Sequence, residues 1–447
     1  MRNLFLALGF LLLGFIPLSA QDFEAIEAYL KDKVDTTEAG PGMAVGILID
    51  GEIVYEKYIG MANLEFMIPI SEQTKFNIAS NAKQFTALAT LKLISEGRLA
   101  LNDDIRKYLP ELLPNIEDPI TVLNLIHHSS GMRSYGNMIG LIDKPWWKDY
   151  GLDNEEVYQL LCQNQDLNFK PGTEYSYSNS GYILLTRIIE VITEQDFPEY
   201  TAEMFQELGM ENTLYPGNYR KPITQRAAPY AKWGRGNYWK HFHSVNDLYG
   251  DGFLFTTLRD QLKWEQTLQY LAEAPEWVQQ GQSKAYRSPE KDYGCGVEFR
   301  QYDGKEVMRH SGSTGAYGAQ FLRFPKEKVA IVVMGNSTAI NYYRTAYDLA
   351  DLLFNIPQKE EKEDLMPEVS AQETPITQWV GDYVRPEGQL IQFLEKDGNL
   401  LWTMHQQEDL IFTRSYGDVF VTESIPGLKY HFEMIDGQAQ FTGYYPG

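Results

Sequence analysis

The stretch FNIASNAK, residues 76–83, is the most informative part of this chain. It leads into a long apolar segment that ends at Gly97. Within it, Ser80 and Lys83 stand three positions apart, so a helix would place both side chains on one face. The apolar residues that follow recur with helical spacing: Phe85, Leu88, Ala89, Leu91, Leu93 and Ile94. The glycine supplies a helix stop. The sequence therefore predicts an amphipathic helix with a hydroxyl and an amine side by side at its buried start.

This pairing of side chains suggests nucleophilic chemistry. A serine hydroxyl is a weak nucleophile at neutral pH, and a partly desolvated lysine beside it can accept its proton. Unpaired N–H groups at a helix N-terminus also stabilise developing negative charge. The alternative is a serine that caps the helix beside a solvated lysine. Residues 288–291, SPEK, repeat the spacing, but their proline and polar neighbours favour a loop, so the apolar context of Ser80 and Lys83 carries the hypothesis.

A second set of polar groups lies in residues 171–182, PGTEYSYSNSGY, a segment rich in turn residues before an apolar helix. Tyr177 and Asn179 alternate in an extended strip, so both side chains are able to face one cleft. A lysine cation beside Tyr177 would lower the pKa of its phenol, which would then shuttle the serine proton. The Asn179 amide is suited to hold the lysine and a substrate amide. Loop packing is the alternative for Tyr177, because the chain has 29 tyrosines and residues 135–137 repeat the Tyr-x-Asn spacing.

The third set is His310, Ser311, Gly312 and Ser313, which follow one predicted strand and precede another. A glycine at that point lets a substrate backbone lie close to the strand. The backbone N–H groups of Ser313 and Ser80 would then form a two-donor oxyanion hole, worth about 3–4 kcal/mol of barrier. A histidine in an ordinary turn is the alternative.

Composition and charge exclude several classes of function. The 447 residues are 43% hydrophobic and 22% charged, which is typical of a globular protein. The formal net charge of −22 would repel phosphate backbones, so no nucleic acid partner is expected. None of the seven histidines has a carboxylate or cysteine set nearby with zinc-ligand spacing, so no metal site is expected.

The N-terminus predicts export. Residues 1–20 combine a basic start, an apolar run over residues 4–16 and a small residue before the predicted cut, which is typical of a secretory signal peptide. That run is too short to span a bilayer comfortably, and no second run of spanning length follows. A periplasmic or secreted protein without a transmembrane anchor is therefore expected. In such a compartment Cys162 and Cys295 are able to pair, but two buried thiols fit the sequence equally well.

The order of strand and helix signals predicts an α+β fold with one antiparallel sheet flanked by helices. A hairpin over residues 43–58 turns at Asp50-Gly51, mostly helical patterns follow, and strand signals return from residue 297 onward. A closing helix is predicted over residues 342–354. We expect a main domain over residues 21–356, an acidic linker over 357–375 and a small all-β domain over 376–447.

The three polar sets, in their order and spacing, resemble the serine β-lactamase and penicillin-binding-protein superfamily, specifically its class-C-like branch of exported peptidases and esterases. The resemblance covers roughly residues 22–355. Two further stretches are similar to sequence segments typical of that branch: LIHHSSGM at 125–132 and GFLFTT at 252–257. The trailing all-β segment resembles the small barrel-like, lipocalin-like domains appended to some of these peptidases.

The resemblance implies a β-lactamase/transpeptidase-like fold and a role for each residue. Ser80 would be acylated, while Lys83 and Tyr177 would move protons and Asn179 would position the substrate. The N–H groups of Ser80 and Ser313 would hold the oxyanion, and water activated by Tyr177 would release the acyl group. No metal or cofactor is implied.

One departure from the family pattern bears on the substrate. His310 stands where β-lactamases typically have a lysine, and a neutral histidine offers no permanent cation to a substrate carboxylate. The resemblance therefore favours hydrolysis of an amide or ester bond in a small peptide, with D-amino acids included, or in an ester. A cell-wall peptide is one candidate partner. Two alternatives stay open: a class-C-like β-lactamase, and a catalytically silent cell-envelope binding protein.

Overall fold

The computed structural model of the chain describes residues 20–34, 39–141, 151–218, 220–233, 238–242, 246–282, 287–288, 291–357, 370–384, 390–403, 410–422, 428–435 and 437–444. Residues 1–19 of the predicted signal peptide and 358–369 of the predicted linker lie outside these ranges. So do the two central residues of the SPEK sequence, 289–290.

A seven-stranded antiparallel sheet forms the centre of the N-terminal part, as predicted. Its strands, in spatial order, are β2 (Glu52–Ile59), β1 (Met43–Ile49), β13 (Val329–Gly335), β12 (Tyr317–Phe324), β11 (Lys305–Thr314), β10 (Val297–Tyr302) and β9 (Tyr293–Gly294). The β1–β2 hairpin turns at Asp50-Gly51. Strand β1 pairs along its whole length with β13, from Met43 opposite Gly335 to Ile49 opposite Val329. Segments from both ends of this part of the chain therefore close the sheet.

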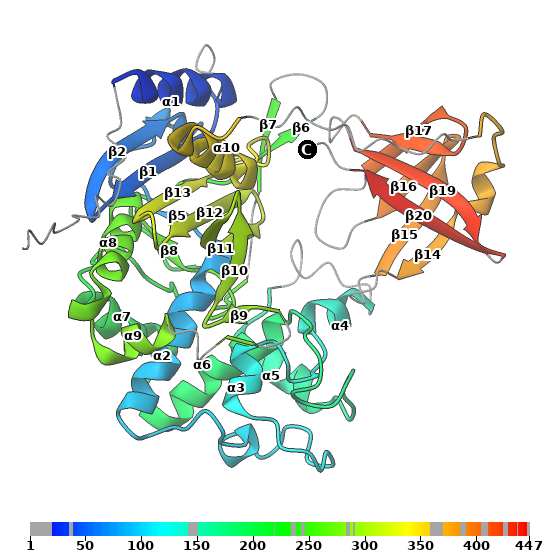
Figure 1. Cartoon of the computed structure of the whole chain (residues 1–447). Helices are drawn as coiled ribbons and strands as arrows, with labels where there is room; N and C mark the ends of the chain where they lie inside the picture. The colour runs from blue at the N-terminus through cyan, green and yellow to red at the C-terminus, as the bar shows by residue number, and fades with distance from the viewer. Residues whose placement is uncertain are drawn as a thin grey trace, which may run out of the picture.

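Helices α1 (Ala20–Lys33) and α10 (Tyr342–Phe354) cover one face of this sheet (Figure 1). Successive side chains of β1 point to opposite faces, so Val45 and Ile47 join the core beneath these helices while Ala44 joins the other core. The other main contributors to the core beneath these helices are Ile26, Leu30, Ile331, Val333, Leu349 and Leu353. Because both faces are covered, the central strands are apolar at nearly every position.

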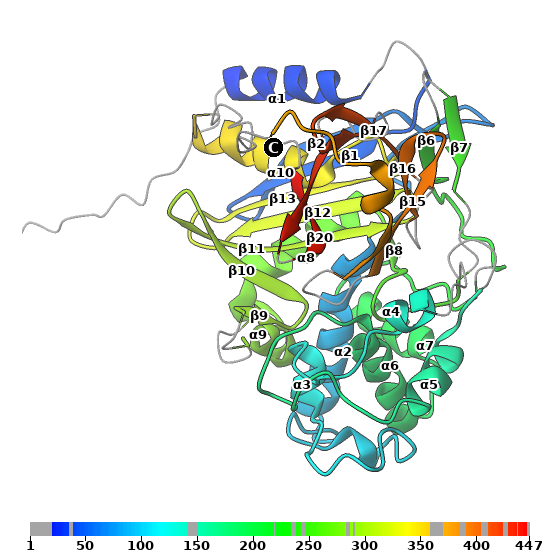
Figure 2. The ribbon, with the colours of Figure 1, turned by 90° about the vertical axis from the view of Figure 1, so that its right-hand side faces the viewer.

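Helix α8 (Leu258–Gln269) packs on the opposite face, where Gly46 leaves room for the side chain of Leu262. A larger helical layer continues from it (Figure 2). Its helices are α2 (Lys83–Ser95), α3 (Val122–Ile126), α4 (Tyr135–Leu141), α5 (Asn154–Cys162), α6 (Asn179–Thr193), α7 (Phe197–Glu207) and α9 (Glu276–Gly281). Short 3₁₀ turns are η1 (Ala79–Ala82), η2 (Ile105–Lys107) and η3 (Leu271–Glu273). Small strand pairs are β3 (Met61–Asn63) with β4 (Ile68–Pro69), β5 (Phe76–Asn77) with β8 (Phe255–Thr256), and β6 (Tyr230–Trp233) with β7 (Tyr238–His241).

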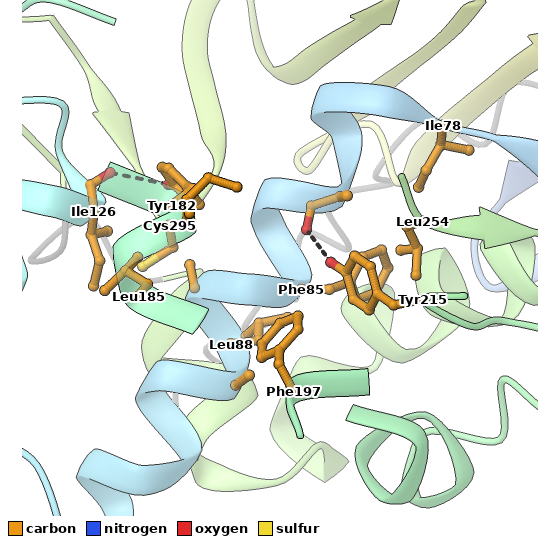
Figure 3. Packing of buried hydrophobic residues seen from close by; sticks show 14 of the residues in the cluster. Ile78, Phe85, Leu88, Ile126, Tyr182, Leu185, Phe197, Tyr215, Leu254 and Cys295 are labelled. Carbon is orange, nitrogen blue, oxygen red and sulfur yellow. Dashed lines mark hydrogen bonds between the residues drawn. The ribbon is translucent and has the colours of Figure 1, made fainter. Parts of the chain in front are cut away.

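Helix α2 is buried on nearly every side, so the prediction of an amphipathic helix was wrong. Figure 3 shows Tyr182 and Cys295 to one side of the helix and Tyr215 and Leu254 to the other. A helix that is covered all round is typical of the interior of a large domain. Its polar residues are satisfied internally, since Thr86 Oγ1 donates to the carbonyl of Gly250 at 2.7 Å.

The C-terminal part forms a separate seven-stranded near-barrel, which confirms the predicted all-β fold. Its strands pair in sequence order: β14 (Gly381–Val384), β15 (Leu390–Lys396), β16 (Asn399–Thr403), β17 (Leu410–Tyr416), β18 (Val419–Val421), β19 (Lys429–Ile435) and β20 (Gln438–Tyr444), preceded by the turn η5 (Ile376–Gln378). Large aromatic side chains fill its core, including Trp379, Phe393, Phe412 and Tyr430. Strand β15 contacts α4 of the N-terminal part. Nowhere in the described residues is a helix both long and apolar enough to cross a membrane.

Candidate active site

Ser80 lies on η1, a 3₁₀ turn that runs directly into α2, rather than in the first turn of the α-helix itself. The turn is held tightly. Ala79 adopts a φ of 48°, which non-glycine residues rarely do, and its N–H donates to Asn77 Oδ1 at 2.9 Å. Strand β5, which precedes the turn, is paired with β8. The serine hydroxyl is therefore presented from a rigid backbone.

Lys83 is fully buried and its ammonium nitrogen faces the serine. Nζ lies 3.1 Å from Ser80 Oγ and donates to the carbonyl of Asp251 at 2.6 Å. The rings of Tyr177 and Tyr182 lie 5.0 and 5.5 Å from the same nitrogen. Desolvation by this burial lowers the pKa of Lys83 to about 8, although the charge of Asp251 opposes the shift. A substantial fraction of Lys83 is thus neutral near pH 8 and able to accept a proton.

Tyr177 lies beside this pair, but the expected lowering of its pKa is wrong. The phenol interacts with the Ser80 hydroxyl, and although Tyr177 as a whole residue is 40% exposed, desolvation raises the pKa of the phenol. The hydrogen bond with Ser80 lowers the pKa by less than the burial raises it. Tyr177 therefore carries its proton near neutral pH, which suits it to donate rather than to accept.

Asn179 begins helix α6 at the edge of the same site. No hydrogen bond joins it to Lys83, because the lysine donates to Ser80 and to the Asp251 carbonyl instead. The prediction that Asn179 holds the lysine was therefore wrong in this structure. Its Oδ1 atom is buried, and it accepts no hydrogen bond from any described residue. This free acceptor is available to a substrate N–H group.

His310 and the residues after it lie inside β11, which continues to Thr314 rather than ending before them. His310 is buried, with Nε2 3.2 Å from the hydroxyl of Tyr293 and Nδ1 2.7 Å from the carbonyl of Ser311. Desolvation, and then the nearby Lys83 charge, lower the pKa of His310 to about 4. The ring is therefore neutral at pH 7, so it supplies a packing surface rather than a cation.

Gly312 allows β11 to lie against η1. A Cβ atom at this position would lie 2.1 Å from the carbonyl oxygen of Ile78 and 3.1 Å from the backbone nitrogen of Ser80. Strand β10 pairs with β11 only as far as Arg309, so residues 310–314 pair with β12 alone and leave their other edge open to the site. Ser313 is exposed on this stretch. Two backbone segments with N–H groups thus meet beside the serine hydroxyl.

A hollow of about 470 Å³ opens over Ser80. Asn179, Asp251 and Ser313 line it, as does Tyr135, a residue that sequence analysis treated only as an accidental Tyr-x-Asn match. The Tyr135 hydroxyl donates to Asp251 Oδ2 at 2.9 Å. Burial raises the pKa of Asp251, while the Lys83 charge acts against that shift. Asp251 was missed altogether, although it directly precedes the GFLFTT stretch.

His128 is a second residue that the sequence did not assign to the site. It is buried, and its ring lies 4.3 Å from that of Tyr177 and 4.7 Å from that of Tyr293. Its Nδ1 accepts from the backbone N–H of Ser178 at 3.1 Å, which fixes the loop that carries Tyr177. Burial, followed by the Lys83 charge, lowers its pKa well below the usual value. The only feature of the sequence that could have pointed to His128 as a site residue was its place in the LIHHSSGM stretch.

The two cysteines are both free thiols, of which Cys295 is buried and Cys162 half-buried. Burial raises the pKa of Cys295 to about 12, so its thiol is inert at neutral pH. Across the described ranges, no cluster of three or more histidine, cysteine, aspartate or glutamate side chains is arranged to hold a metal ion. Beside the hollow, the structure brings together Ser80, Lys83 and Tyr177, with backbone N–H groups nearby.

Comparison with known proteins places this geometry in a family. The Beta-lactamase family model matches residues 26–355. The chain is 28% identical over 337 residues to a D-aminopeptidase of Gluconobacter oxydans (strain 621H), covering 73% of this chain and 62% of that protein. It is 29% identical over 314 residues to protein flp of Staphylococcus aureus (strain MRSA252), covering 66% and 59%. The chain thus spans about three-fifths of the length of these curated relatives.

Similarity to solved structures supports the same fold over nearly the whole chain. The octameric penicillin-binding protein homologue from Pyrococcus abyssi superimposes with a TM-score of 0.67 at 23% identity, covering 95% of this chain and 96% of that one. The two-part architecture of helix-flanked sheet and C-terminal near-barrel therefore has a counterpart among solved structures.

Proposed function

This chain belongs to the β-lactamase family, and from that premise we propose that it is a serine hydrolase which cleaves an amide or ester bond through an acyl-enzyme on Ser80. One observation carries the proposal: the buried Lys83 nitrogen lies 3.1 Å from Ser80 Oγ, and its pKa is lowered to about 8. A base poised near the operating pH is what general base catalysis requires.

The geometry supports a two-step reaction. Neutral Lys83 accepts the Ser80 proton as Oγ attacks the substrate carbonyl, and the N–H groups of Ser80 and Ser313 stabilise the oxyanion. Tyr177, which carries a proton, relays it to the leaving amine or alcohol and regains one from Lys83. Water then attacks the acyl-enzyme and gives a proton to neutral Lys83. Lys83 passes that proton to Ser80 Oγ as the ester bond breaks, so Ser80 leaves as the alcohol and Lys83 is neutral again.

We propose small peptides, including those with D-amino acids, and small esters as the substrates. The similarity to a D-aminopeptidase supports this choice, and the neutral ring of His310 argues against a fixed cation at the place where β-lactamases have lysine. The proposal includes export through the signal sequence at residues 1–20, to the periplasm or the medium. Cell-wall peptides are the candidate partners there.

Labelling with a fluorophosphonate tests the nucleophile. We expect the wild type to be labelled and Ser80→Ala not to be. Ser288→Ala, which removes the serine of the other Ser-x-x-Lys sequence, serves as the matched control and should stay labelled. Equal labelling of wild type and Ser80→Ala would refute the proposal. Rates on D- and L-aminoacyl amides, p-nitrophenyl esters and nitrocefin would then separate a peptidase or esterase from a β-lactamase.

A further inference from the structure

A second hollow adjoins the one over Ser80. It is a shallow depression of about 250 Å³, a volume that includes open solvent at its mouth, and its walls include Arg226, Phe242 and Tyr317. Phe253 and Thr314 line both hollows, so the two lie next to each other, and together they are the groove. Arg226, the cationic side chain in this groove, takes no part in the proposed reaction.

Arg226 is held in place by groups that do not neutralise it. Its Nε donates to the Tyr317 hydroxyl at 3.1 Å, and that hydroxyl donates in turn to the carbonyl of Ala227. The guanidinium carbon lies 5.1 Å from the centre of the Phe255 ring. Within the described part of the chain, no carboxylate forms an ion pair with Arg226, although acidic residues outnumber basic ones 61 to 39.

Such an arginine is an anion receptor. A guanidinium has five N–H donors in a planar fork that matches a carboxylate, and only Nε of Arg226 has an acceptor among the described residues. The side chain is half-buried between aromatic rings, where a charge-assisted hydrogen bond is stronger than in open water. A carboxylate entering the groove would complete the set of hydrogen bonds.

Strand β11 shows on which side of the scissile bond this cation lies. His310, at one end of the open stretch, has its ring 6.2 Å from that of Tyr177. Gly312 lies beside Ser80, and Gly315, just past the strand end, lines the second hollow. At about 3.3 Å per residue, Gly312 and Gly315 are about 10 Å apart along the chain. Tyr177 and the second hollow therefore lie in opposite directions from the serine.

The leaving group must face its proton donor, Tyr177, so the acyl portion of the substrate extends the other way, toward Arg226. We propose that Arg226 is a specificity-determining residue that binds a carboxylate on the acyl portion, so that acidic acyl groups such as glutamyl are preferred. This inference rests on the proposed acyl transfer at Ser80. It adds the chemical class of the acyl group that stays bound to Ser80 in the acyl-enzyme.

A matched pair of substrates isolates the effect of a negative charge on the acyl group. D-glutamyl and D-glutaminyl p-nitroanilide have the same leaving group and nearly the same acyl shape, and the L-enantiomers form a second pair. We expect wild-type kcat/KM to favour the glutamyl substrate of the better-used enantiomer by about 10- to 100-fold. Arg226→Gln should bring that ratio close to one, and Arg226→Lys should retain part of it.

Lys221→Gln is the control, because it removes an exposed cation five positions away in sequence and should keep the wild-type ratio. The thermal midpoint of each variant checks that it is folded. A wild-type ratio near one, with turnover that depends on Ser80, would overturn the Arg226 inference and leave the hydrolase proposal standing. A preference that survives Arg226→Gln would overturn it as well.

Binding without turnover keeps the two proposals distinguishable. Calorimetry on the Ser80→Ala protein would compare glutamic acid α-amide with glutaminamide. We expect the anionic ligand to bind at least about tenfold more tightly, and the difference to vanish in Ser80→Ala/Arg226→Gln. If no anilide is hydrolysed but this preference is present, the Arg226 site stands while the hydrolase proposal falls. Equal binding of both ligands, or none, overturns the Arg226 site.

Discussion

The two seven-stranded sheets of the chain are built in opposite ways. In the N-terminal sheet, β1 pairs with β13, so neighbours in space are remote in sequence. In the C-terminal sheet, each strand from β14 to β20 pairs with the next one along the chain. The N-terminal sheet also has uneven strands, because β11 continues past the last residue that β10 pairs. The candidate site therefore lies where β11 extends beyond β10 and contacts η1.

The hydrophobic cores of the two sheets also differ in how they are formed. The N-terminal sheet depends on helices to cover both faces, and the most deeply buried of these helices carries Lys83. The C-terminal sheet encloses its own aromatic core, and the site residues described above are all outside it. Substitutions in the N-terminal part should therefore change the chemistry, whereas substitutions in the C-terminal sheet should change only the stability of that sheet.

The largest effect is expected from Lys83→Ala. Without the base, kcat on a p-nitrophenyl ester should fall by about 10²–10⁴-fold. Lys92→Ala, on the far end of the same helix and half-buried, is the matched control and should keep wild-type kcat. A Lys83→Ala enzyme that keeps a tenth or more of the wild-type kcat would remove Lys83 from the mechanism.

Phe393→Ala tests the independence of the C-terminal sheet. Phe393 is fully buried in the aromatic core, so its truncation should destabilise that sheet by about 3–5 kcal/mol. Calorimetry should show the transition of the C-terminal part shift to a lower temperature, while fluorophosphonate labelling of Ser80 continues. Loss of labelling at the temperature where the C-terminal sheet unfolds would show that the two sheets are coupled, and the comparison would fail.

Gly312→Ala probes the meeting of β11 with η1. The added methyl would press on the Ile78 carbonyl, so the strand must move away from Ser80. Because a shift of about 1 Å in a reacting group can cost about 10²-fold in rate, kcat/KM should fall by about that factor. Gly136→Ala is the control, since a Cβ there meets no atom within 4 Å. Equal kcat/KM for the two variants would mean that the close approach of Gly312 to the Ile78 carbonyl is not needed for activity.

The smallest effect is a pH dependence. Burial lowers the pKa of Lys83 to about 8, and the base must be neutral to act, so kcat/KM should rise by about tenfold between pH 7 and pH 9 and then level off. The same shift means that the unfolded chain holds this proton between about pH 8 and 10.5 while the folded chain does not. The contribution of Lys83 to stability therefore rises with pH in that window. A rate profile that is flat from pH 7 to pH 9 would contradict the assignment.

Local patterns were enough to predict much of the fold. The Asp50-Gly51 turn and the alternation around it gave the β1–β2 hairpin, and helix α10 has the predicted bounds. Ser80 and Lys83 meet because helix geometry fixes the spacing of residues three apart, whatever the rest of the chain does. Where chemistry depends on neighbours in sequence, the sequence alone is informative.

Contacts between remote segments could not be predicted in this way. The Lys83 nitrogen reaches the Asp251 carbonyl, and Tyr135 reaches the Asp251 carboxylate, across more than a hundred residues in each case. The raised pKa of Tyr177 has the same origin, because burial depends on which segments cover the phenol. The burial of α2 on nearly every side likewise depends on the segments that pack around it, so its own sequence does not predict it.

The remote pairing of the N-terminal sheet has a consequence for synthesis. Ser80 leaves the ribosome about 230 residues before Gly312, and at roughly 5–20 residues per second that interval lasts roughly 10–50 s. Throughout it, β1 has no β13 to pair with and the hydroxyl has no second N–H donor nearby. A nascent chain therefore remains chemically inert until the strands from both ends of the sheet have met.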